Sequence, residues 1–274
     1  MKKRGNSLIK PKLKQVCALT LLAVTLLMVG CQTVTDSKVD PKKSVQVRTQ
    51  MAAEYIKQND YDAAKRELDT ALELNSRDAN ANMMMGVLLQ REGSPQNIEK
   101  DENFFKTAIS IAPKNAQARN NYGTYLYQLK RYNEALPQFD IAGSTLGYDQ
   151  RYTAFENKGI IYVKLNDIVN AEKSFNQALH VNRDSYISML ELAEINYLRH
   201  DIPTATKFYQ QAVNLVGEKN LNARALWVGI RLARATGNPL EMQALVNQLR
   251  ALYPDSPEYQ RYLQIQYSTE VVWK

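Results

Sequence analysis

The feature that most constrains the fold of this chain is a repeat with a period of 34 residues, which begins near Val45. In the second half of each unit, two small residues stand seven positions apart, with a large apolar residue between them. Four of these triads are Ala64-Leu68-Ala71, Ala135-Phe139-Ala142, Ala171-Phe175-Ala178 and Ala205-Tyr209-Ala212. In the first half, a small residue precedes an aromatic or aliphatic one, as in Ala52 with Tyr55, Gly86 with Leu89, Gly123 with Leu126 and Gly159 with Tyr162.

This pattern predicts pairs of antiparallel helices, because two helices approach closely only where one of them presents Gly or Ala. One helix pair cannot bury its apolar face alone, so neighbouring pairs must stack. The pattern resembles the tetratricopeptide repeat (TPR) family, although the signature Trp of that family is absent from these repeats. The predicted fold class is all-α: a TPR superhelix, or α-solenoid, of about six helix-turn-helix repeats with a C-terminal capping helix.

The predicted TPR domain covers residues 45–274, with repeats at 45–78, 79–115, 116–149, 152–185, 186–219 and about 220–256. The second repeat is longer by three residues, which fall in the turn 92–96, where an insertion costs little. The sixth repeat is irregular, with helices expected over 221–236 and 239–253. Ser256 can cap a further helix, with Pro257 in its first turn. This last helix, at about 257–267, is expected to close the open end of the array.

The positive charge of the chain is concentrated at its N-terminus. Six of the 35 Lys and Arg residues lie in residues 1–30, which contain no Asp or Glu. The rest of the chain carries 29 cations against 28 anions. Because this part is nearly neutral, it lacks the overall basic field that attracts phosphate, and we expect no nucleic-acid partner.

Residues 1–30 are predicted to be a signal peptide. The basic stretch precedes the apolar run Val16–Val29, which is too short to span a bilayer. The run ends in Met28-Val29-Gly30-Cys31, which resembles the bacterial lipobox, with Met28 where that pattern prefers Leu. The resemblance implies that Cys31 is acylated and becomes the new N-terminus. The alternative is a buried Cys that follows an uncleaved helix.

The residue after the cysteine is Gln32, whereas retention in the inner membrane usually requires Asp there. The resemblance therefore implies an outer-membrane lipoprotein that faces the periplasm. Residues 31–44 are predicted to be the lipidated Cys followed by a flexible polar tether. Since Cys17 leaves with the signal peptide, the mature chain would have no free thiol and no disulfide.

No arrangement of residues typical of an enzyme is evident. The two histidines, His180 and His200, each fall near the end of a predicted helix. The sequence contains no phosphate-binding loop, no GxSxG motif and no HExxH motif. We therefore predict a protein that is not an enzyme, with no catalytic residues, no metal ligands, no cofactor and no small-molecule substrate.

A binding surface is predicted on the first helices of repeats 2 and 3. In a TPR array the first helix of each repeat lines the concave face, where residues are free of the packing rule. The TPR resemblance assigns eight residues to that face: Asn80, Met83, Val87, Gln90, Gln117, Asn120, Thr124 and Tyr127. This mixed polar and apolar surface suits a peptide and lacks a row of Lys and Arg. The alternative for Met83 and Val87 is partial burial against a neighbouring helix.

Several segments lie outside the general TPR pattern and point to a narrower family. They are residues 120–126, 151–159, 226–231 and 253–259. With the lipobox and six repeats, the chain is similar to the type IV pilus biogenesis lipoproteins of the PilF/PilW family. The resemblance implies a pilotin, monomeric when free, which binds the pilus secretin and promotes its localisation and multimerisation at the outer membrane.

Two other functions remain open at this stage. The first is a TPR lipoprotein scaffold that organises cell-wall hydrolases or other envelope assembly complexes. The second is an enzyme accessory protein or a chaperone without a role in pili.

Overall fold

The computed structural model describes residues 40–93, 98–269 and Trp273. In these residues the regular structure is entirely helical, so the predicted all-α TPR class is confirmed. Residues 45–274 form one compact unit. The predicted signal peptide and Cys31 lie outside the described residues. Thirteen α-helices are present in the described part of the chain: α2 (Pro41–Lys57), α3 (Tyr61–Leu74), α4 (Ala79–Glu92), α5 (Ile98–Ile111), α6 (Ala116–Gln128), α7 (Tyr132–Ser144), α8 (Arg151–Lys164), α9 (Ile168–Val181), α10 (Tyr186–Leu198), α11 (Ile202–Val216), α12 (Ala223–Ala235), α13 (Pro239–Leu252) and α14 (Pro257–Ile265).

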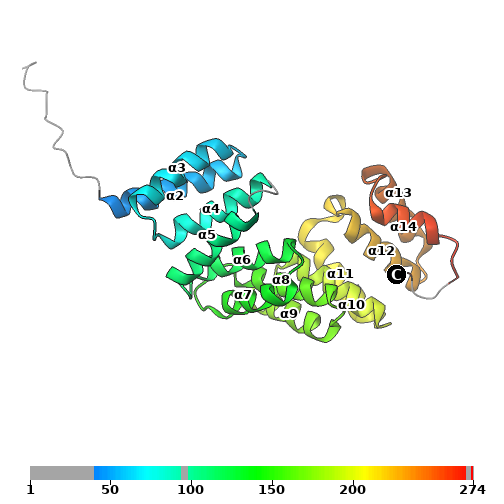
Figure 1. Cartoon of the computed structure of the whole chain (residues 1–274). Coiled ribbons are helices and arrows are strands. Elements are labelled where there is room, and N and C mark those ends of the chain that lie inside the picture. The colour runs from blue at the N-terminus through cyan, green and yellow to red at the C-terminus, as the bar shows by residue number, and fades with distance from the viewer. Residues whose placement is uncertain (1–39, 94–97, 270–272, 274) are drawn as a thin grey trace, which may run out of the picture. The chain divides into compact units, whose positions relative to one another are not determined.

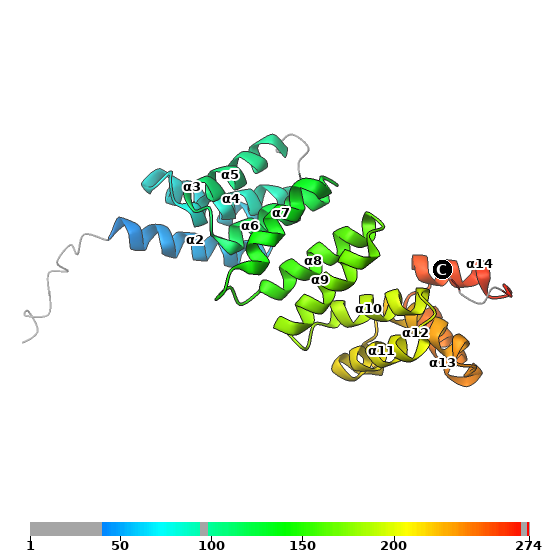
Figure 2. The ribbon, with the colours of Figure 1, turned by 90° about the horizontal axis from the view of Figure 1, so that it is seen from below.

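The helices from α4–α5 to α12–α13 pair in the order in which they follow one another, and each pair packs on the next (Figures 1 and 2). Helices α2 and α3 share a buried cluster with α4 and are joined by the ion pair between Arg48 and Glu67. Each pair falls within one of the six predicted repeats, except that α2 and α8 begin earlier than expected. A short 3₁₀ helix, Glu218–Asn220, joins the fifth repeat to the sixth.

The tether predicted for residues 31–44 is wrong for its last four residues, which belong to α2. The helix begins at Pro41, a position where the missing N–H of proline costs nothing. The carboxylate of Asp40 accepts a hydrogen bond from the backbone N–H of Lys42 at 3.0 Å. Asp40 and Pro41 together are therefore a helix start, which the polar composition of this segment concealed.

A residue in the left-handed backbone conformation ends the first helix of every repeat. These residues have φ between 58° and 70° and are Asn59, Gly93, Lys130, Asn166, His200 and Gly237. In four of the six turns the next residue, an Asp or Asn, caps the following helix through its side chain. His200 is thus a turn residue, and His180 lies in the last turn of α9.

The small residues of the repeat lie where the helices of a pair make contact. Ala64, Ala135, Ala171 and Ala205 are fully buried in the second helices. In the first helices of repeats 2 and 3, Gly86 and Gly123 face the rings of Phe105 and Phe139, where a Cβ atom would lie 3.0 Å and 2.9 Å from the nearest ring atoms. The predicted rule of close approach at Gly and Ala therefore matches the packing.

The predicted last helix is α14, which begins at Pro257 and ends two residues before the expected position. Its start is capped as predicted, because the Ser256 hydroxyl accepts from the backbone N–H of Tyr259 at 3.2 Å. This helix packs against α12, the first helix of the sixth repeat. Trp273, near the end of the chain, is buried in the same region.

Candidate partner-binding site

The first helices of the repeats lie side by side: α4 contacts α6, α6 contacts α8, and α10 contacts α12. We call the surface that these helices form, together with residues 46–53 of α2, the first-helix face. All eight binding residues predicted from the sequence belong to α4 or α6. The structure places them in two groups along this face.

The first group surrounds a cavity of about 260 Å³ at the N-terminal ends of α4 and α6. Asn80, Met83 and Gln117 line it, and the side chains of Asn80 and Gln117 are exposed. The Asn80 side-chain oxygen accepts from the Asn115 amide at 3.1 Å, which fixes the rim between the two helices. The cavity presents amide groups at its rim and thioether at its floor, a combination suited to a peptide side chain.

Met83 is not the surface residue that the sequence predicted. It is 2% exposed and belongs to the core that α2, α3 and α4 share, so it can contact a ligand only as the floor of the cavity. Val87 is half-buried between the cores of repeats 2 and 3. The alternative of partial burial thus applies to both apolar positions, because a helix packed on two sides hides more of its surface than the repeat pattern alone reveals.

The second group lies further along the same helices. The Gln90 amide donates to Gln128 at 2.7 Å and so links the ends of α4 and α6. The Thr124 hydroxyl donates to the carbonyl of Asn120. The side-chain oxygen of Asn120 is buried and has no hydrogen-bond partner among the described residues. An acceptor in that position is costly to leave unpaired, so a ligand N–H would relieve it.

Tyr127 completes the second group. Its ring packs against that of Tyr132 with 5.8 Å between ring centroids, and the residue is half-buried. Burial raises the pKa of Tyr127, which keeps the phenol neutral. The ring is therefore held rigid with its neutral hydroxyl available as a hydrogen-bonding group.

The sequence interpretation missed the contribution of the first repeat. Four residues of α2 line the cavity of the first group: Gln46, Thr49, Gln50 and Ala53. Each stands 34 positions before a residue of α4, and three of those α4 residues are among the predicted ones: Asn80, Met83 and Val87. The repeat period itself was therefore the signal that could have located them.

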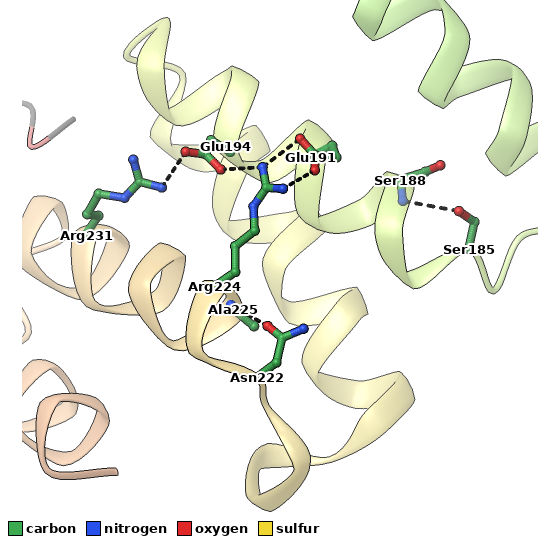
Figure 3. Close-up of polar contacts among 8 residues, drawn as sticks. All are labelled: Ser185, Ser188, Glu191, Glu194, Asn222, Arg224, Ala225 and Arg231. Carbon is green, nitrogen blue, oxygen red and sulfur yellow. Dashed lines mark hydrogen bonds and ion pairs between the residues drawn. The ribbon is translucent and has the colours of Figure 1, made fainter. Parts of the chain in front are cut away.

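A second candidate region, which the sequence interpretation also missed, is a network of ion pairs between α10 and α12 (Figure 3). Glu191 and Glu194 stand three residues apart on one side of α10. Arg224 pairs with both of them, at 2.5 Å and 2.9 Å, and Arg231 pairs with Glu194 at 2.9 Å. Glu191 and Arg231 are buried, Glu194 is half-buried, and Arg224 is the most exposed of the four.

Burial and ion pairing shift the pKa values of the two carboxyl groups of this network in opposite directions. Burial raises the pKa of Glu191 even though Arg224 is paired with it. Burial also acts on Glu194, but the positive charges of Arg231 and Arg224 outweigh it and hold its pKa below the ordinary value. Glu191, Glu194 and Arg224 line a cavity of about 290 Å³, which Trp227 and the start of α14 also border.

No group of three or more His, Cys, Asp or Glu side chains is placed to hold a metal ion in residues 40–93, 98–269 and 273. Within the same ranges, no helix has the length and apolar character that a membrane span requires.

Comparison with known proteins agrees with this architecture. Models of the tetratricopeptide repeat match residues 49–97, 104–136 and 157–227. The stacked helix pairs and these matches define the chain as a TPR protein.

The chain is also 31% identical over 249 residues to the type IV pilus assembly protein PilF of Pseudomonas aeruginosa, across 88% of this chain and 95% of that protein. The structure of P. aeruginosa PilF matches with a TM-score of 0.75 and 29% identity, covering 82% of this chain and 98% of that one. The structure of PilW, described as a widely conserved type IV pilus biogenesis factor, matches with a TM-score of 0.68, 29% identity, and coverage of 80% and 98%. The chain belongs to the PilF/PilW family of type IV pilus assembly TPR proteins.

Proposed function

We propose that this protein is a pilotin: a lipid-anchored protein of the outer membrane that binds the type IV pilus secretin and promotes its localisation and multimerisation. Pilus biogenesis and twitching motility would depend on it. The observation that carries the proposal is the 31% identity to PilF over almost the whole chain. The first-helix face supports a role in binding, since it offers a cavity and a buried polar atom of Asn120 without a hydrogen-bond partner among the described residues.

The anchor is the first part of the proposal. Cys31 follows a basic and apolar leader and is the acylation site that the lipobox resemblance implies. One acyl chain binds a membrane only marginally, whereas several chains hold a protein there stably. A secretin subunit bound to an anchored protein would share its location, which raises the local concentration of subunits that must assemble.

The anchor is tested by Cys31→Ser, with Cys17→Ser as the matched control because Cys17 lies within the leader. We expect Cys31→Ser to leave the outer-membrane fraction and to reduce the amount of assembled secretin, while Cys17→Ser behaves like the wild type. Normal outer-membrane fractionation of Cys31→Ser would show that the anchor is assigned wrongly.

The second part of the proposal is the binding surface on α4 and α6, which we call the groove. Asn120 offers a buried acceptor without a partner among the described residues, and Tyr127 offers a rigid ring with a polar tip. Aromatic side chains of this kind are enriched at binding hot spots. We therefore place the secretin segment along α4 and α6, with the cavity between Asn80 and Gln117 as a second point of contact.

The groove is tested by the double variant Asn120→Ala with Tyr127→Ala and by its affinity for the periplasmic region of the secretin. The matched control is Asn103→Ala with Tyr267→Ala, since both of those residues are exposed and lie outside the first-helix face. We expect a loss of at least tenfold in affinity for the first variant only, with unchanged circular dichroism for both. Unchanged affinity in the folded variant would move the site away from α4 and α6.

The deletion phenotype separates the pilotin from a scaffold for cell-wall hydrolases. Loss of surface pili and of twitching, with normal cell shape, supports the pilotin. Altered cell shape with intact pili would support the scaffold instead.

A further inference from the structure

A tryptophan near the C-terminus is buried in a site formed by the last two repeats and α14. Trp273 is 1% exposed, although α14 ends at Ile265 and only seven residues separate the two. Five side chains from α10, α12 and α14 contact it, and we call them the Trp273 site: Tyr197, Trp227, Arg231, Arg234 and Tyr262.

The indole ring of Trp273 is held on several sides. It stacks on Trp227, with 6.3 Å between the ring centroids and 11° between the ring planes. The ring of Tyr262 packs edge-on against the indole, with 6.3 Å between the two ring centroids. The guanidinium of Arg234 lies 4.4 Å from the ring centroid, within the range of a cation–π interaction. An aromatic ring of this size and flatness is what the site accepts.

The backbone of residue 273 is bound as well. Its N–H donates to the Tyr197 hydroxyl at 3.0 Å, and its carbonyl accepts from Arg231 at 3.4 Å. Arg231 is 1% exposed and is fixed by Glu194 at 2.9 Å and by the rings of Tyr197 and Trp227, each about 5 Å from it. The guanidinium that donates to the backbone carbonyl is therefore held by side chains of α10 and α12 and not by the tail.

These contacts are all made to groups that any peptide with a tryptophan carries: the indole ring, one backbone N–H and one backbone carbonyl. We propose that the Trp273 site is a second binding site, whose ligand is an extended segment of a partner protein that carries a tryptophan. The tail of this chain occupies it in the absence of the partner. The proposal goes beyond the secretin groove and does not depend on it, because the groove lies on α4 and α6.

The tail is a strong competitor but not an optimal ligand. Because the tail belongs to the same chain as the site, it competes at a high effective concentration, and a free peptide therefore binds the wild-type chain weakly. The indole N–H of Trp273 is buried and has no hydrogen-bond partner among the described residues, a cost that a partner segment avoids when it supplies an acceptor of its own. A partner segment at high local concentration can therefore displace the tail.

The test uses the full chain with Trp273→Ala and a fluorescent peptide with the sequence of residues 266–274, QYSTEVVWK. We expect Trp273→Ala to bind this peptide at least tenfold more tightly than the wild type. A control peptide with alanine in place of the tryptophan should bind neither. Adding Tyr197→Phe to the variant removes the acceptor for the backbone N–H and should weaken binding about fivefold.

Trp273→Phe is the second variant, because it keeps a ring in the site if alanine prevents folding. It should bind the peptide with intermediate affinity, because a tail that carries phenylalanine in place of Trp273 competes less well for the Trp273 site than the wild-type tail does. Folded variants that bind the peptide no better than the wild type overturn the proposal, as does equal binding of the two peptides. Wild-type dimers that form with rising concentration and are lost in Trp273→Ala would assign the site to the tail of a second copy, which also overturns it.

Discussion

The ring of Phe175 lies directly against the backbone of Gly159, so that a Cβ atom at Gly159 would come within 2.6 Å of the ring atom Cε1. Phe175 is fully buried, as are Ala171 and Ala178 of the same helix. The contact joins α8 to α9 within the fourth repeat. The same pairing of a glycine with an aromatic ring joins the two helices of the second repeat, and likewise the two helices of the third repeat.

We predict that Gly159→Ala destabilises the protein. In an open helix this change stabilises by about 0.5–1 kcal/mol, because glycine loses more conformational entropy on folding. Here the added methyl group overpacks the contact with Phe175, at a typical cost of about 1–3 kcal/mol. Thermal unfolding should show a lower Tm for Gly159→Ala.

Gly86→Ala is the matched control for this prediction, because a Cβ there would lie 3.0 Å from the ring of Phe105 and needs a smaller adjustment. Its Tm should fall less than that of Gly159→Ala. A rise in Tm for Gly159→Ala would mean that α8 and α9 separate easily at this point.

The contacts within repeats could be predicted because they follow from the period of 34 and from the size of glycine and alanine. The repeat bounds and the turns between helices are local consequences of that pattern, and the cap at Ser256 follows from the residues at the start of α14. Met83 shows where local reasoning ends. It occupies the position that Asn120 holds in the next repeat, but the packing of α2 and α3 buries it.

The ion-pair network and the Trp273 site could not be predicted, because they depend on contacts across long stretches of sequence. Glu194 and Arg231 are 37 residues apart, and Tyr197 is 76 residues from Trp273. Arg231 ends an apolar run whose composition suggests a core helix rather than a buried charge. Only the stacking of the fifth and sixth repeats brings these groups together.

We predict that Arg224→Met destabilises the protein by about 1–3 kcal/mol, because it leaves the buried Glu191 carboxylate without its charged partner. The matched control is Lys57→Met, which breaks a pair with Glu54 in which both side chains are largely exposed. Exposed pairs contribute about 0.2–1 kcal/mol, so this control should change stability little. If urea unfolding shows the same loss of stability for Arg224→Met and Lys57→Met, the ion pairs between α10 and α12 contribute no more to stability than an exposed pair.

Glu102 gives the protein stability that acid removes. Arg131 donates to its carboxylate, and this bond outweighs burial and lowers the pKa of Glu102 to about 2. A carboxyl group whose pKa is lowered in the folded state stabilises the protein at pH values above its unfolded pKa of 4.5. This contribution is lost as the pH falls towards 2. We predict that Glu102→Gln is less stable than the wild type by about 1–3 kcal/mol at pH 7.

The measurement for Glu102 is the difference in stability between variant and wild type as a function of pH. The difference should shrink steadily between pH 4.5 and pH 2, because the wild-type carboxyl group becomes protonated there. A difference that stays constant across this range would mean that packing, and not the charge of Glu102, accounts for the loss.

Glu156 should behave in the opposite way. It is 5% exposed in α8, and the hydroxyl of Ser185 donates to its carboxylate at 2.5 Å. Burial outweighs this hydrogen bond and raises the pKa of Glu156. Ionisation is therefore harder in the folded state, and the wild type loses stability as the pH rises from the unfolded pKa of 4.5 through the raised folded value.

We predict that Glu156→Gln stabilises the protein by about 1–2 kcal/mol at pH 7, because the amide keeps an acceptor for Ser185 and carries no charge to bury. The gain should vanish below pH 4.5, where the wild-type carboxyl group is neutral in both states. Glu73→Gln, at an exposed position of α3, is the control and should show no gain at either pH. If Glu156→Gln is instead less stable than the wild type at pH 7, the ionised carboxylate contributes to the fold, and the balance between burial and its hydrogen bond is the reverse of the one described here.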